Sequence, residues 1–151
     1  MKTKRKTILL VTVLVALAVV LSGAFFMQPA RDNHIEDVTM IQLIATPERY
    51  HGKLVRVVGV GNLEFEGNAI YLSKDDISYQ VYNAVWLDFD NNTTLSYAEA
   101  KKHNGKYVIV EGIFDKDHSG HMGLFHGAIT NISRYELNLA EVELAETENV
   151  K

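Results

Sequence analysis

The stretch Gly52–Gly59, GKLVRVVG, returns later in the chain as Gly105–Gly112, GKYVIVEG. Both copies follow the pattern G-K-x-V-x-V-x-G. Because the valines recur at every second position, each copy predicts a β-strand with one apolar face. The leading glycine permits a tight turn into the strand, and the closing glycine suits a bulge or a sharp bend. Two strands that bend in this way indicate a small barrel, in which strands curl around one core.

Further strand and helix signals surround the repeat. Strands are expected within three segments: Asn68–Ser73 (NAIYLS), Asn83–Phe89 (NAVWLDF) and Gly123–Arg134 (GLFHGAITNISR). A first helix is expected over Asp37–Ala45, capped by Asp37 or Thr39 and ended by Pro47, and a second over Ser96–His103. The order β-β-β-α-β-β predicts a mainly β fold with one or two short helices, an OB-fold-like five-stranded barrel.

The turn and strand signals also carry a family resemblance. The runs TPERYHGKLVRVVG, NAVWLDF, NGKYVIVEGIFD and GHMGLFHGAITNISRYE resemble small, uncharacterised exported bacterial proteins of the OB-fold kind. Those proteins look like distant relatives of the tRNA-anticodon-binding-like OB group. The similarity covers most of residues 38–137. It implies the barrel fold and transfers no active site, because fold alone does not give function.

The first 27 residues predict export. Four cations, at positions 2, 4, 5 and 6, precede the uncharged run Ile8–Met27, which is long enough for a helix to span a membrane. The cations favour a cytosolic N-terminus and an extracytoplasmic domain. The alternative is a cleaved signal peptide, cut after Ala24, which would release a periplasmic or secreted protein. We therefore expect a leader over residues 1–30, an OB-like domain over 31–137 and an acidic tail over 138–151.

Composition narrows the function. The chain has no cysteine, which excludes disulfides, thiolate catalysis and sulfur-ligated zinc. After the leader, 11 cations face 19 anions, a net charge of −8, so a nucleic-acid partner is not expected. No catalytic motif is present. The sequence therefore predicts a non-enzymatic binding or scaffold module of the cell envelope that meets a protein or a glycan, tethered to the membrane by its leader.

Aromatic residues are the first candidates for ligand contact. Tyr79 and Tyr82 lie in a polar segment and are expected at an exposed binding edge, and Tyr71 is expected on the barrel face, where aromatic rings stack on sugars and bases. Trp86 and Phe125 are expected in the core. The loops 63–68 and 74–82 are expected to border the binding surface.

A twelve-residue segment from Asp88 to Glu99 suggests an alternative, calcium binding. Oxygen ligands stand at positions 1, 3, 5, 9 and 12, which are Asp88, Asp90, Asn92, Ser96 and Glu99. Thr93 replaces the glycine usual at position 6, and a strand signal precedes the loop where a helix is usual. The other interpretation is a polar turn in which Ser96 caps the next helix and Glu99 completes a capping box.

Histidines supply a second metal hypothesis. His118, His121 and His126 cluster in the sequence and could bind zinc or copper, with His51 or His103 joining them. The alternative is a hairpin with exposed imidazoles, since the run from Asp115 to Gly120 has the residues of a tight strand connection. A calcium- or transition-metal-binding exported domain is thus the alternative function, and calcium is the one cofactor that the sequence suggests.

Overall fold

The two copies of the repeat form antiparallel partners in the barrel, β2 (Leu54–Asn62) and β5 (Tyr107–Asp115), each nine residues long. The structure is a computed structural model, and it describes residues 34–89 and 96–140. Leu54 lies opposite Ile113 at one end of this pair and Val60 lies opposite Tyr107 at the other. The alternating valines face inward, as the repeat predicts: Val55, Val57, Val108 and Val110 are fully buried.

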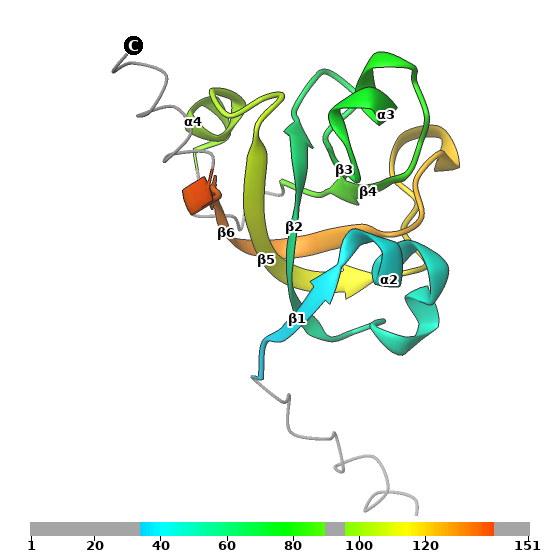
Figure 1. Cartoon of the computed structure of the whole chain (residues 1–151). Helices are drawn as coiled ribbons and strands as arrows, with labels where there is room; N and C mark the ends of the chain where they lie inside the picture. Colours follow the sequence, from blue (N-terminus) through cyan, green and yellow to red (C-terminus); the bar gives the residue numbers. More distant parts are fainter. Residues whose placement is uncertain (1–33, 90–95, 141–151) are drawn as a thin grey trace, which may run out of the picture. The chain divides into compact units, whose positions relative to one another are not determined.

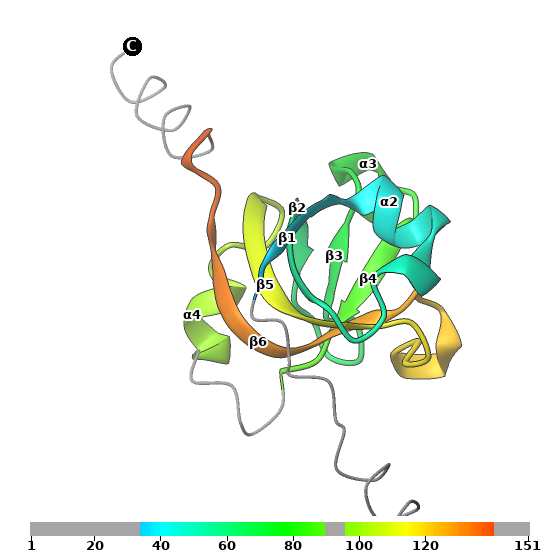
Figure 2. The same ribbon diagram turned by 90° about the horizontal axis from the view of Figure 1, so that it is seen from below.

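Three further strands close the barrel. They are β3 (Ala69–Tyr71), β4 (Ala84–Leu87) and β6 (Ala128–Leu137). The strands follow the order β2-β3-β4-β6-β5, and the β2–β5 pairing closes the ring (Figures 1 and 2). All neighbours are antiparallel except β4 and β6, which run parallel. The predicted mainly β, closed five-stranded barrel is confirmed.

The first helix begins later than predicted, because a sixth strand precedes it. β1 (Glu36–Thr39) runs parallel to β2, with Glu36 opposite Val55 and Thr39 opposite Val58. The helix α2 covers Met40–Ala45, and Thr39 caps it in a reciprocal capping box with Gln42. Asp37, the other predicted cap, instead bonds Arg56 of β2 across 3.1 Å. The sequence did not predict this short strand, because the apolar pattern from Met40 to Ile44 is typical of a helix and was extended back over it.

Other short helices lie between the strands. A 3-10 turn, η1 (Pro47–Arg49), follows α2. The sequence did not predict α3 (Lys74–Ser78), which Ser73 caps. The predicted second helix is present as α4 (Tyr97–Lys101), shorter than Ser96–His103, and a further 3-10 turn, η2 (His121–Gly123), lies before β6. Within the described residues, no helix is long and apolar enough to cross a membrane.

The side chains of β3 and β4 divide between two apolar clusters. Ile70, Val85 and Leu87 point into the barrel and join its main core, to which α2 adds Met40 and Leu43. The alternate residues face outward. These outward-facing residues belong to a second cluster, against which the partly buried Trp86 and Ile77 pack. The buried members of the second cluster are Val60, Ala69, Tyr71, Ala84 and Phe125. The barrel thus has an apolar patch on its outer surface over β3 and β4, which we call the β3–β4 face.

Candidate functional site

Three connections surround the β3–β4 face. They are the β2–β3 loop (63–68), the β3–β4 connection (72–83) and the β5–β6 loop (116–127), each bounded by the strands given above. The β2–β3 and β5–β6 loops contribute residues to two neighbouring pockets, and the β3–β4 connection contributes to one of them. These pockets and their rims make up the candidate site.

The β2–β3 loop is a tight turn held at its base. The Leu63 amide donates to the Asn104 side-chain oxygen across 2.8 Å, and Asn104 donates back to the Leu63 carbonyl across 3.0 Å. At its tip the Gly67 amide donates to the Glu64 carbonyl across 3.1 Å. Glu66 lies in the left-handed region, with φ of 58°. This geometry holds Glu64 and Glu66 at the border of the face.

The β5–β6 loop packs its aromatic residue onto the face. The Phe125 amide donates to the Ser119 carbonyl across 3.2 Å, and the next amide, of His126, donates to Ala84 of β4. The Phe125 ring lies 5.3 Å from the Trp86 ring and 5.6 Å from the Tyr82 ring, centroid to centroid. Gly120 is needed here, because a Cβ atom would lie 2.6 Å from the Trp86 ring.

The first pocket, which we call the acidic pocket, has a volume of about 330 Å³. Its walls combine two carboxylates, three aromatic rings, amides and aliphatic side chains: Asn62, Glu64, Glu66, Gly67, Tyr71, Ile77, Gln80, Tyr82, Leu124 and Phe125. Burial above all, and then nearby Tyr82 and Glu64, raises the pKa of the Tyr71 hydroxyl above its ordinary value. The phenol therefore stays neutral at physiological pH and faces a negatively charged wall.

The second pocket, the histidine pocket, shares Glu66 with the first and measures about 420 Å³. Its other lining residues are Asn68, Trp86, Asp88, His118, Gly120 and His121. His118 Nδ1 lies 3.9 Å from an Asp88 oxygen, and His121 Nε2 lies 3.4 Å from a Glu66 oxygen. Within the described residues, neither pocket is lined by a lysine or an arginine. The site is thus acidic and aromatic.

The structure brings two of the three candidate tyrosines together. Tyr71 and Tyr82 line the acidic pocket. Tyr79 does not line it, but lies in the same connection with 79% of its surface exposed. Phe125 is buried, as expected, whereas Trp86 is only partly buried and borders the histidine pocket. The sequence does not single out Glu64 and Glu66, because glutamates in a loop are usually solvated.

Three of the five candidate calcium ligands, Asp88, Ser96 and Glu99, lie within the residues that the structure describes. Asp90 and Asn92 lie outside the described residues. Asp88 faces His118, as above. The Ser96 side chain accepts the Glu99 amide across 3.4 Å, and the Glu99 carboxylate contacts Lys102 Nζ at 2.7 Å. In the described part of this segment, Ser96 therefore acts as the helix cap of the alternative interpretation.

The histidines fall into different places. His118 and His121 share the histidine pocket, whereas His126 is exposed and does not line it. His103 stacks on the Tyr135 ring at 6.3 Å. His51 lies apart from the other histidines, in a cluster with Asp115 and Asp117.

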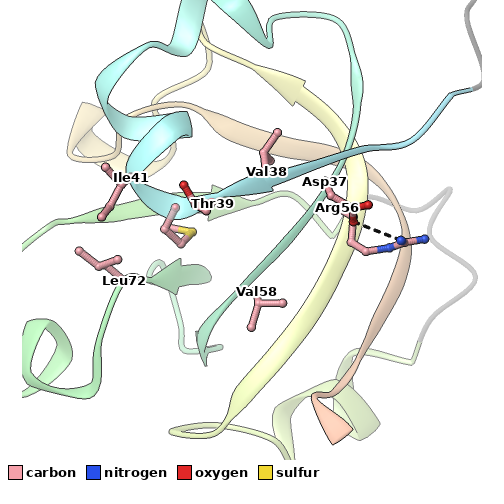
Figure 3. A pocket seen from close by; sticks show the side chains of 8 residues that line it. Asp37, Val38, Thr39, Ile41, Arg56, Val58 and Leu72 are labelled. Carbon is pink, nitrogen blue, oxygen red and sulfur yellow. Dashed lines mark hydrogen bonds and ion pairs between the residues drawn. The ribbon is translucent and has the colours of Figure 1, made fainter. Parts of the chain in front are cut away.

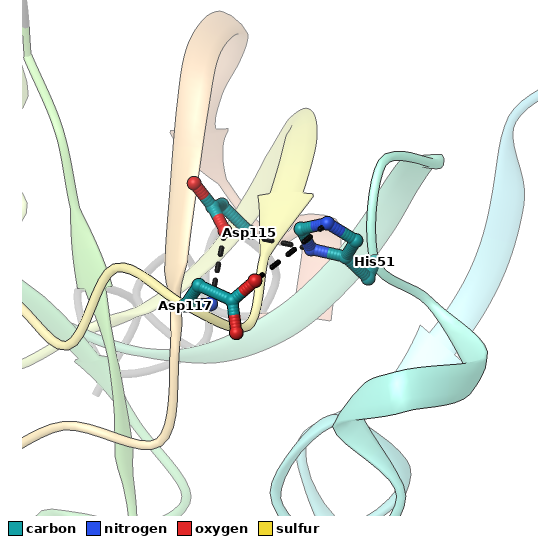
Figure 4. A group of neighbouring side chains, drawn as sticks. All are labelled: His51, Asp115 and Asp117. Atoms are coloured by element: carbon teal, nitrogen blue, oxygen red, sulfur yellow. Dashed lines mark hydrogen bonds and ion pairs between the residues drawn. The ribbon is translucent and has the colours of Figure 1, made fainter.

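His51 lies beside Asp115 and Asp117 at the end of β5 (Figure 4). One ligand atom of each lies within 4.8 Å of the others, a spacing that a metal ion could use. Existing hydrogen bonds already engage these atoms. The Lys116 amide donates to His51 Nδ1 across 3.3 Å, and the Lys116 ammonium contacts Asp117. This exposed cluster links the turn before β2 to the end of β5.

An apolar groove lies elsewhere, between β1, α2 and β2 (Figure 3). Its volume is about 390 Å³, and Ile41, Val58 and Leu72 line it together with the Asp37–Arg56 ion pair. Ile41 is 63% exposed. This surface, the β1 groove, offers apolar contact but few polar groups.

No protein-family model, curated protein or solved structure matches this chain.

Proposed function

We propose that this chain is a non-enzymatic binding module of the bacterial cell envelope, whose OB-like barrel uses the β3–β4 face to bind an envelope protein or glycan. In OB-type barrels, ligands bind the second and third strands together with the first and last loops. The strand order supports such a barrel, with β3 and β4 as its second and third strands. The β2–β3 and β5–β6 loops are then its first and last loops.

The observation that carries this proposal is the position of the two pockets. Both lie on the β3–β4 face, both draw on the β2–β3 and β5–β6 loops, and they share Glu66. Concave sites lined by aromatic side chains with a few converging polar groups are typical of ligand binding. Carboxylates in both pockets disfavour a phosphate-bearing ligand, and so support a partner other than nucleic acid.

The location of the module is proposed from its leader. The apolar run from Ile8 to Met27 would anchor the chain in the cytoplasmic membrane with its N-terminus inside. The barrel would then face the extracytoplasmic space. A cleaved leader would give the same compartment with a periplasmic or secreted barrel.

Affinity capture tests the proposed function. The full-length chain, purified in a nonionic detergent, is used to capture components of an envelope fraction. The variants are Tyr82→Ala on the face and Val58→Ala in the β1 groove, whose native side chains are 39% and 42% exposed. We expect the wild type and Val58→Ala to retain the same partner and Tyr82→Ala to lose it. Equal recovery by Tyr82→Ala would contradict the proposal.

Transition-metal binding is a second candidate function, favoured by one observation. Two imidazoles and two carboxylates, from His118, His121, Asp88 and Glu66, line one pocket, and these side chains are typical zinc ligands. A metal that binds only the folded state raises stability by about 2.7 kcal/mol at a hundredfold excess over its Kd. We expect zinc to raise the melting temperature of the full-length chain, and His118→Gln but not His126→Gln to abolish the rise. No shift with zinc would contradict this candidate.

Calcium binding stays a prediction that the same thermal melt tests. A rise with calcium that Glu99→Ala abolishes would support the loop from Asp88 to Glu99 as a calcium site. The same melting temperature in calcium and in EDTA would contradict it.

A further inference from the structure

We propose that the acidic pocket receives a lysine or arginine side chain from a protein partner. This inference rests on the proposed function, because it takes the β3–β4 face as the binding face. It adds the class of partner and the group that anchors it. Charge, wall chemistry, the rim of the pocket and the backbone of the loops each support it.

The charge of the pocket is negative and only partly compensated. Glu64 and Glu66 both line it, and within the described residues no lysine or arginine does. The titratable group facing Glu66 is His121, at 3.4 Å. Tyr71 and Tyr82 are the other titratable groups of the lining. A cationic ligand would satisfy the carboxylates, because charge-assisted hydrogen bonds are stronger than neutral ones.

The walls suit a long side chain with a charged end. Tyr71, Tyr82 and Phe125 supply aromatic rings, and Ile77 and Leu124 supply aliphatic surface. Aromatic rings attract cations, and apolar walls cover the methylene stem of lysine or arginine. The volume of about 330 Å³ lies near the lower end of the range of about 300–1,000 Å³ that is usual for ligand pockets. The pocket therefore fits one side chain better than a large planar ligand.

The rim of the pocket indicates a protein partner. Phe65, Tyr79 and Met122 are 91%, 79% and 80% exposed. Each is next in sequence to a residue that lines one of the two pockets, and each comes from a different connection around the face. Aromatic residues and methionine are enriched in protein interfaces, where contacts surround an anchor buried in a pocket. Three exposed apolar side chains, each next to a residue that lines one of the two pockets, fit that arrangement.

The backbone of the three connections is unusual at the same places. Glu66, Gln80 and Met122 have φ values of 58°, 55° and 57°. This left-handed region is uncommon for residues other than glycine, and such strain gathers at functional sites. Glu66 and Gln80 both line the acidic pocket. The strained conformations therefore hold pocket and rim residues in position on all three connections.

Calorimetric titration with a defined probe tests the inference. The probe is octalysine with blocked ends, added to the full-length chain in a nonionic detergent. We expect octalysine to bind and the Glu64→Gln/Glu66→Gln double variant to bind at least about tenfold more weakly, because it lacks both charged acceptors. The matched control is Glu48→Gln/Glu136→Gln, which changes the net charge equally at exposed positions outside both pockets. The control should stay within about twofold of the wild type, because neither of its residues lines a pocket.

An uncharged form of octalysine and an amino-sugar oligosaccharide complete the test. Acetylated octalysine should not bind. Equal weakening by both double variants, or absence of octalysine binding, would overturn the inference, and so would tighter binding of a glucosamine oligosaccharide than of octalysine. These failures are distinct from failure of the proposed function, which depends on loss of the captured partner in Tyr82→Ala.

Discussion

Gly59 and Gly112 must be glycine because a neighbouring strand approaches each of them closely. A Cβ atom at Gly59 would lie 2.7 Å from the Tyr71 carbonyl oxygen, and one at Gly112 would lie 2.7 Å from the Thr130 carbonyl oxygen. At Gly112 the register between β5 and β6 also shifts, as the predicted bulge requires. Gly52 and Gly105, which open the repeat, have φ of +76° and +73° with open space around them. The four glycines thus serve two needs, turns and close approach.

At the residue scale, Gly112→Ala should destabilise the barrel more than Gly105→Ala. The first change forces a methyl group against backbone, which costs about 2 kcal/mol or more. The second costs about 1 kcal/mol, because it strains only its own left-handed backbone. Urea unfolding followed by the fluorescence of Trp86, the single tryptophan, measures both. Equal losses would show that close approach at Gly112 is unimportant.

At the element scale, one buried carboxylate joins three strands. Glu111 of β5 lies opposite Arg56 of β2 and opposite Arg134 of β6. Its Oε1 atom accepts from Arg56 Nε at 2.7 Å and from Arg134 Nη1 at 2.9 Å. Burial raises the pKa of Glu111, but the hydrogen bonds and charges of the two arginines outweigh burial, and the pKa lies below its ordinary value of 4.5. Arg56 extends the network to Asp37 of β1.

The variant Glu111→Gln should lose about 1 kcal/mol of stability at pH 7, since the two arginines lose their shared charged acceptor. Because the pKa of Glu111 is lowered on folding, its contribution is complete above about pH 4.5 and is lost as the pH falls through the lower folded value. Urea midpoints at pH 7, 5 and 3 should therefore show a gap between wild type and variant that narrows at pH 3. A constant gap would contradict the assigned role.

The elements could be predicted from the sequence where apolar residues form a clear pattern. The repeat predicted β2 and β5, and apolar runs located β3, β4 and β6. The sequence did not predict β1 and α3, because their local signals overlap with those of helix caps and polar loops. Tertiary contacts determine the secondary structure of such segments. Asp37, for example, lies in β1 opposite Arg56 and accepts a hydrogen bond from it, a contact that its neighbours in sequence do not reveal.

The candidate site could be predicted only in part, for a similar reason. Tyr71 and Tyr82 were candidates because aromatic rings bind ligands, and the structure brings them into one pocket. Glu64 and Glu66 gave no signal, because two glutamates in a loop are usually solvated. Only barrel closure brings them beside the β5–β6 loop, more than fifty residues later in the chain.

At the scale of the whole molecule, the absence of cysteine makes the proposed topology directly testable. Single cysteines are introduced as Thr3→Cys before the apolar run and Glu48→Cys at an exposed position of the barrel domain. In intact spheroplasts, a membrane-impermeant maleimide should label Glu48→Cys in the membrane fraction and leave Thr3→Cys unlabelled. Labelling of Glu48→Cys only after lysis would place the barrel in the cytosol and contradict the proposal.

We propose that the whole molecule meets a protein partner through the β3–β4 face. Site-specific photocrosslinking in cells that make the full-length chain tests it most directly, with a photoreactive phenylalanine analogue in place of Phe65 at the rim or of Ile41 in the β1 groove. Both positions are exposed, at 91% and 63%. We predict one discrete protein adduct from position 65, lost when Glu64→Gln/Glu66→Gln is added, and none from position 41. An adduct from position 41 alone, or no adduct from position 65, would contradict the claim.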